Sequence, residues 1–165
     1  MRTVLAIVAA LILSGCSRST AFVHFTKLDS MQERAALSLK SATIVDTTYR
    51  KAIISTIYLN QVETAMDTEN EFFLVVLYLR KKGRLQLPNV DDTGAKYQLT
   101  LNGKAALSIT TIEIDNPLRR LMPINNNWNY FYKVEFPTSK KNDLILTLEN
   151  NQSNSVSLTY QKDDL

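Results

Sequence analysis

The chain has 165 residues, with 19 Lys and Arg against 16 Asp and Glu, and it contains one His and one Cys. The net charge of +3 is small, and the two signs are interspersed without a basic stripe, which argues against nucleic acid as a partner. A single Cys excludes a disulfide within the chain, so hydrophobic packing must stabilise the fold. The length is sufficient for one domain with its own core.

The chain begins with a segment typical of exported proteins. Arg2 supplies a positive charge, and Val4–Leu13 is an apolar run of ten residues. This run is far shorter than the roughly 20 residues of a membrane-spanning helix, and it suits the apolar part of a signal peptide. The small residues Ser14 and Gly15 then precede Cys16. We therefore predict that residues 1–15 form a signal peptide.

Leu13-Ser14-Gly15-Cys16 closely resembles the lipobox of bacterial lipoproteins. The resemblance implies cleavage before Cys16, a diacylglyceryl thioether on its sulfur and acyl chains of the palmitate type. Two or more chains would anchor the protein stably, since each buried methylene contributes about 0.8 kcal/mol. The alternatives are an ordinary signal peptide followed by a free cysteine, or a short buried helix. Lipidation is favoured because an unpaired cysteine in an exported protein otherwise requires an explanation.

The same resemblance sets the expected location and domain organisation. It implies a lipid-anchored protein at the periplasmic face or the cell surface, and Ser17 after the cysteine favours the outer membrane. Residues 16–21 would be the lipidated cysteine and a short tether, and residues 22–165 one β-sandwich domain. A tether of five residues reaches less than roughly 20 Å. The domain is therefore expected to lie close to the membrane.

The first half of the domain contains one helical signal, followed by strong strand signals. The spacing of Ser30 and Glu33 matches a capping box and predicts a helical turn, followed by a strand near Leu37–Val45. Tyr49–Asn60 is rich in β-branched and aromatic residues and predicts a second strand. The continuous apolar run Glu71–Leu79 predicts a central strand that is covered on both faces.

The second half predicts further strands joined by hairpins. Asn102-Gly103 is the signature of a type I′ turn between Tyr97–Leu101 and a return strand that begins at Lys104 and places Leu107 and Ile109 on one face. A change of apolar phase predicts a bulge or corner near Thr110–Thr111. Further strands are predicted over Tyr130–Phe136, Leu144–Leu148 and Val156–Tyr160, the last two forming a hairpin across Asn150–Asn154. The pattern predicts an all-β fold, a single antiparallel β-sandwich of about 7–8 strands that is immunoglobulin-like or related. The pattern also loosely resembles uncharacterised envelope lipoproteins with such domains.

The sequence offers no catalytic constellation. Nucleophilic catalysis by Ser or Cys requires a nearby His, and the only one, His24, lies next to the predicted tether. Structural zinc sites require clustered Cys and His, which are lacking because the single Cys16 is assigned to lipidation. We therefore expect no catalytic residue, no cofactor and no metal site.

Two features suggest interaction or modification. Trp128 precedes an aromatic strand, and the favoured interpretation is that its side chain fills the core. The alternative is an exposed partner patch formed by Trp128, Arg119 and Arg120, since Trp and Arg are enriched in interface hot spots. Asn151 begins an Asn-x-Ser pattern with Glu149 two residues upstream, a candidate glycosylation site that chance also produces often.

The sequence therefore favours a non-enzymatic binding or assembly component of the bacterial cell envelope. Its expected partners are the membrane, through the lipid on Cys16, and an envelope protein. One alternative is an envelope hydrolase that uses loop carboxylates, and another is a purely structural accessory of an envelope complex.

Overall fold

The computed structural model describes residues 30–45, 50–63, 69–80, 83–85, 87, 95–124, 126–150 and 154–162. The predictions for the signal peptide, for Cys16 and its tether, and for Asn151 lie outside the described residues.

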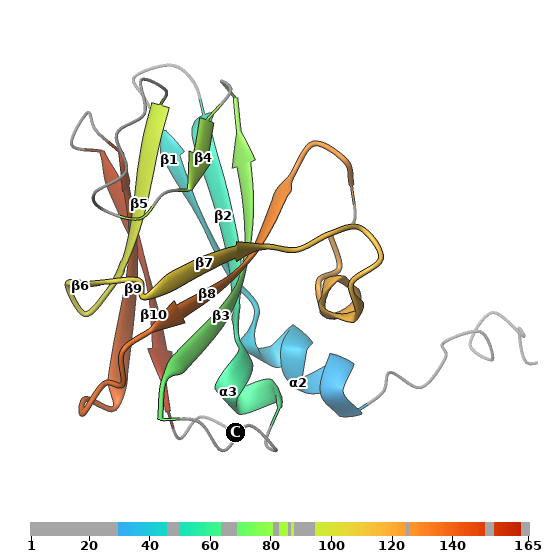
Figure 1. Ribbon diagram of the computed structural model, residues 1–165, viewed down its shortest axis with the longest axis vertical. Helices are drawn as coiled ribbons and strands as arrows, with labels where there is room; N and C mark the ends of the chain where they lie inside the picture. The colour runs from blue at the N-terminus through green and yellow to red at the C-terminus, as the bar shows by residue number, and fades with distance from the viewer. Residues whose placement is uncertain are drawn as a thin grey trace, which may run out of the picture.

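The described chain forms two β-sheets packed face to face, with helical segments on the outer face of one of them (Figure 1). Sheet 1 has the order β1-β2-β3-β8-β7, formed by β1 (Lys40–Val45), β2 (Arg50–Tyr58), β3 (Glu71–Leu79), β8 (Tyr130–Phe136) and β7 (Ser108–Thr111). Sheet 2 has the order β10-β9-β5-β4, formed by β10 (Ser155–Gln161), β9 (Asp143–Asn150), β5 (Ala95–Leu101) and β4 (Gly83–Leu85), and the short β6 (Lys104–Ala105) pairs with β5. All pairs are antiparallel except β4 with β5.

The predicted single β-sandwich is confirmed. Among the described strands, the consecutive β1, β2 and β3 lie side by side in sheet 1, whereas strand C of the immunoglobulin order lies in the opposite sheet from A and B. The predicted hairpin between β9 and β10 is also confirmed, since these strands pair along their whole length.

The central position of β3 explains its continuous apolar run. β3 pairs with β2 on one side and with β8 on the other. Successive side chains of a strand point to opposite faces. Phe73, Val75 and Leu77 therefore pack in the core between the sheets, while Leu74 and Val76 pack beneath the helical layer. Both faces of β3 are covered over most of its length, as the sequence predicted, and Phe72 and Tyr78 on the outer face are half-buried.

The helical layer consists of α2 (Ser30–Ser38), α3 (Leu59–Val62) and the 3-10 helix η2 (Pro117–Leu121). The capping-box spacing correctly indicated a helix, but α2 also takes in Leu37, which the sequence analysis had placed in a strand. Residues two apart lie on the same face of a strand, but Ala35 is buried against sheet 1 while Leu37 is exposed, which fits the period of a helix. The sequence pattern did not indicate α3, whose Leu59 and Val62 are fully buried. None of the helices in the described part of the chain has the length and hydropathy of a membrane-spanning segment.

The chain crosses from sheet 2 to sheet 1 immediately after the predicted type I′ hairpin. Asn102 and Gly103 have φ angles of 49° and 79°, which confirms the turn. The crossing lies at Ala106 and Leu107, between β6 and β7, and not near Thr110–Thr111 as predicted. The backbone N–H of Leu107 already donates to Glu135 O of sheet 1 at 2.7 Å. Leu107 lies before β7 and is exposed, whereas Ile109 packs against the sandwich core, so the two do not share a face of one strand as predicted. The change of phase reflects Ile112, which is buried beneath the helical layer instead of in the sandwich core.

Candidate functional site

Trp128 is exposed over 73% of its surface, so the core interpretation of this residue was wrong. β8 begins at Tyr130, as predicted, so Trp128 lies before the strand and the alternation of the strand does not direct its side chain into the core. A turn precedes β8, in which the backbone N–H of Asn129 donates to Asn126 Oδ1 at 3.1 Å. This turn carries Trp128 outward instead of into the core.

A hollow of about 260 Å³ lies beside Trp128 on the outer face of sheet 1. Two cross-strand pairs of β2 and β3 contribute to it, Ile53 with Tyr78 and Ser55 with Val76. The remaining lining residues come from the segment before β8, namely Ile124, Asn126, Trp128 and Asn129. Apart from its amide and hydroxyl groups the lining is apolar, and it contains no charged side chain.

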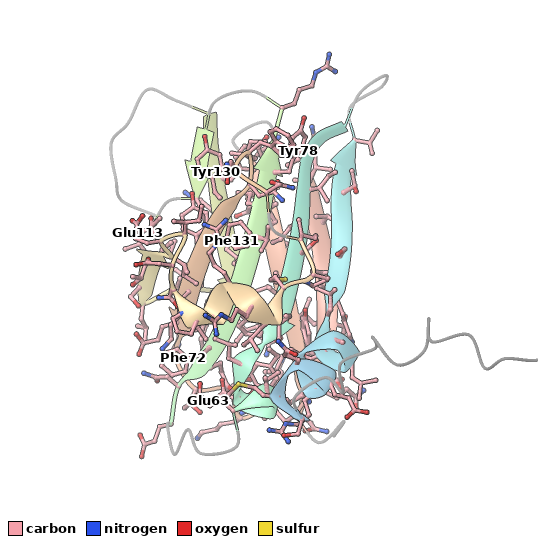
Figure 2. The ribbon with its side chains drawn as sticks, turned by 90° about the vertical axis from the view of Figure 1, so that its right-hand side faces the viewer. Glu63, Phe72, Tyr78, Glu113, Tyr130 and Phe131 are labelled. Atoms are coloured by element: carbon pink, nitrogen blue, oxygen red, sulfur yellow. The ribbon has the colours of Figure 1, made fainter. Side chains whose placement is uncertain are left out.

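The hollow forms where the helical layer ends. On the same outer face, Ile57, Leu74 and Phe131 are buried with residues of α2, α3 and η2. Figure 2 shows η2 crossing the middle of this face below Phe131, with Tyr78 and Tyr130 beyond it, away from α2. Part of the outer face is therefore packed, and the part next to Trp128 is open.

Arg119 connects η2 to the turn that carries Trp128. Asn116 caps η2 by accepting from the Leu118 backbone N–H at 3.0 Å, which sets the start of this helix. The guanidinium carbon of Arg119 lies 3.8 Å from the centre of the Phe131 ring. Arg119 Nη2 donates to Asn126 O at 3.5 Å, while Arg119 Nε is buried and has no hydrogen-bond partner among the residues that the structure describes.

Arg120 takes a different direction from Arg119. A 3-10 helix has three residues per turn, so consecutive side chains point about 120° apart. Arg120 is exposed, and no hydrogen bond joins it to the turn at Asn126 among the residues that the structure describes. Of the two arginines in the predicted patch, the structure brings only Arg119 to the turn that carries Trp128.

A charged cluster lies at the other end of β3 from the hollow, around Glu71. Glu71 is only 2% exposed, and it accepts hydrogen bonds from Tyr58 OH at 2.6 Å, from the Ser139 backbone N–H at 2.9 Å and from Lys162 Nζ at 2.5 Å. Lys162 also donates to Ser139 O at 2.7 Å. Burial, together with the hydrogen bond to Glu71, raises the pKa of Tyr58 far above its ordinary value. This cluster joins the start of β3, the segment after β8 and the end of β10.

The sequence pattern did not predict the Glu71 cluster. Its only local signal was an acidic residue at the start of an apolar run, and the partner Lys162 lies 91 residues further along the chain. Both carboxylate oxygens of Glu71 accept hydrogen bonds. We therefore interpret the cluster as one that stabilises the fold.

Within the described ranges, no three His, Cys, Asp or Glu side chains gather in a way that could hold a metal ion. Comparisons with protein-family models, with curated proteins and with solved structures found no match to this chain.

Proposed function

We propose that this chain is a lipid-anchored protein of the bacterial cell envelope that binds a partner protein through the surface around Trp128, without catalysing a reaction. The apolar run Val4–Leu13 and the lipobox that ends at Cys16 support the anchor. The exposure of Trp128 beside an apolar hollow is the observation that carries the binding surface.

An exposed Trp next to an apolar hollow favours a protein interface. An aromatic side chain of this size buries about 150–250 Å² when it is covered, which makes its exposure to water unfavourable unless a partner covers it. Binding hot spots are enriched in Trp and Arg and tend to sit in or beside pockets. Trp128 lies beside the hollow, and Arg119 contacts the turn that carries Trp128, so a Trp, an Arg and a pocket occur together at this surface.

The chemistry of the hollow supports binding over catalysis. Among the described lining residues, Ser55 carries the only aliphatic hydroxyl that could act as a nucleophile. Its Oγ is hydrogen-bonded to Ser41 Oγ at 2.7 Å. The lining residues include no His, Asp, Glu or Lys that could act as a general base toward it. Glu71, the buried carboxylate, is hydrogen-bonded within its own cluster. No observation favours the hydrolase alternative.

The anchor is tested by mass spectrometry of the mature protein from its native host. We expect an N-terminal peptide that begins at Cys16 and carries acyl chains, and we expect a Cys16→Ser variant to leave the membrane fraction. A mature protein that begins elsewhere, or an unmodified Cys16, would exclude the anchor.

The binding surface is tested by recovering the lipidated protein from crosslinked membranes, with Trp128→Ala beside the wild type. We expect a stoichiometric partner whose recovery falls at least about tenfold in the variant, as for a binding hot spot. Ile145→Ala is the matched control, because Ile145 is also exposed but lies on β9 of sheet 2.

Three outcomes would count against this assignment. If Trp128→Ala does not fold, Trp128 has a packing role. If it folds and recovers the partner as well as the wild type, the partner binds elsewhere. If both variants lose the partner equally, the effect is not specific to this surface.

A further inference from the structure

We propose that the surface around Trp128 recognises a peptide segment that combines one large apolar side chain with a carboxylate. The apolar side chain would enter the hollow, and the carboxylate would pair with the guanidinium of Arg119. This inference rests on the proposed function, which it extends by naming the chemistry of the partner.

The size of the hollow favours a single side chain as its occupant. Sites for small molecules usually have volumes of about 300–1,000 Å³, and the hollow beside Trp128 has about 260 Å³. Ile53, Val76 and Tyr78 line it from sheet 1 and Trp128 lines it from the turn. A hollow of this size and lining suits one aromatic or large aliphatic group.

The turn at the edge of the hollow is already hydrogen-bonded within itself. Asn126 Oδ1 accepts from the Asn129 backbone N–H, and Asn126 O accepts from Arg119 Nη2. These bonds hold the turn in place before a partner binds, so less conformational entropy is lost on binding.

Arg119 provides the second half of the site, because its charge has no counterpart in the described part of the chain. Its guanidinium is stacked over Phe131 and held by one long hydrogen bond of 3.5 Å to Asn126 O, and none of the described carboxylates forms an ion pair with it. A carboxylate is the acceptor that best matches the planar donors of arginine, and it can accept two hydrogen bonds at once. The partner is therefore expected to bring the missing negative charge.

The nearest acidic residues in the sequence do not take this role. Glu113 and Asp115 precede η2, and both side chains are exposed. Figure 2 shows Glu113 on the opposite side of Phe131 from Tyr78, which lines the hollow.

An anionic membrane surface fits these observations less well than a peptide. Membrane surfaces attract clusters of several Lys and Arg, whereas the lining of the hollow has none and Arg119 is a single cation in a fixed orientation. One charge beside one apolar hollow corresponds to two neighbouring side chains of a peptide.

The test uses the full lipidated chain in detergent micelles and a display library of short random peptides. Trp128 is the only tryptophan, so its fluorescence reports binding at this site alone. We expect selected peptides to place an Asp or Glu within a few residues of a large apolar residue. Replacing that acid by its amide should weaken binding about tenfold, as for a lost charge-assisted hydrogen bond.

Variants of Arg119 identify the contact. Arg119→Gln should weaken the acidic peptide about tenfold and leave its amide counterpart unaffected, while Arg119→Lys should give an intermediate affinity. Lys104→Gln is the charge-matched control, because Lys104 is exposed on the β5–β6 hairpin of sheet 2. Melting temperatures of all variants establish that they are folded. If Arg119→Gln does not fold, the affinity of Arg119→Lys for the acidic peptide decides the test.

Several results would overturn the inference. These are a failure to select any peptide, selected peptides without an acidic residue, or equal affinities of the wild type and Arg119→Gln. Binding to phosphatidylglycerol vesicles that is lost in Arg119→Gln would point to a membrane surface instead. A loss of all peptide binding in Trp128→Ala, measured with labelled peptides because this variant has no tryptophan, together with no effect of Arg119→Gln, would remove only the carboxylate and leave the proposed function in place.

Discussion

Glu71 and Arg119 are two charged side chains that the fold of sheet 1 treats in opposite ways. Glu71 lies at the end of the inner face, where Tyr58, Ser139 and Lys162 all donate hydrogen bonds to its carboxylate. Arg119 lies over the outer face, with its Nε buried and without an acceptor. Arg119 retains one weak hydrogen bond and an aromatic contact.

Burial has different energetic consequences for these two charged side chains. A buried charge that is paired and hydrogen-bonded is compatible with a stable core, whereas a buried N–H without an acceptor is unfavourable. Among the described residues nothing accepts a hydrogen bond from Nε of Arg119, which is the residue proposed above to contact a carboxylate of the partner. We therefore interpret Glu71 as a structural residue and Arg119 as a binding residue.

The largest expected effect comes from Glu71→Ala. The change leaves Tyr58 OH and the Ser139 N–H without their acceptor and Lys162 without its counter-ion, and breaking a buried pair in this way costs about 3–5 kcal/mol. Lys162 is 29% exposed and can regain hydration, so we expect the lower value, about 3 kcal/mol, in urea unfolding. Glu149→Ala, at an exposed position of β9, is the control. Equal effects of the two changes would refute the structural role of Glu71.

Alkaline pH tests the inner face further. Burial raises the pKa of both Tyr58 and Tyr160 above the ordinary value of about 10. Above pH 10 the unfolded chain releases these protons while the folded chain keeps them, so stability is complete below pH 10 and falls as the pH rises. The expected slope is about 1.4 kcal/mol per pH unit for each tyrosine.

Phenylalanine variants assign this slope. Tyr58→Phe and Tyr160→Phe should each remove one tyrosine's share of the pH dependence of the unfolding free energy. Tyr130→Phe is the control substitution, because Tyr130 is 40% exposed and both buried tyrosines remain. A slope that none of the three variants changes would show that other groups cause it.

The smallest expected effect on stability belongs to Arg119→Met. Methionine keeps an apolar stem over Phe131 and removes the buried Nε, so we expect a change within about 0.5 kcal/mol, with an increase in stability as the more informative result. Thermal unfolding measures this change, and the fluorescence titration with acidic peptides measures binding in the same samples. A large loss of stability would place Arg119 with Glu71 among the structural residues.

The regular strands of the sandwich were accessible from the sequence because their signals are local. β3 has the bounds predicted for it, and β8 follows the predicted alternation from Tyr130 to Phe136. The exceptions occurred where two periodicities overlap, at Leu37 in α2 and at Ile112, which packs under the helical layer. In these places the packing between sheet 1 and the helical layer decides which residues are buried.

The candidate site was only partly accessible. The sequence singled out Trp128, Arg119 and Arg120 by residue type, but it could not show whether the indole is buried. The hollow, the contact of Arg119 with Phe131 and the different direction of Arg120 depend on how η2 lies across sheet 1.

The sequence by itself determined where the long strands and the tight hairpins lie, because side-chain alternation and the positive φ of Asn102-Gly103 are properties of neighbouring residues. It did not indicate the short strand β4. Only the tertiary structure decided that Glu71 meets Lys162, that Arg119 keeps a buried donor without an acceptor, and that Trp128 stays exposed. Pairing and exposure depend on residues that are distant in the chain and become neighbours only when the sheets and the helical layer pack together.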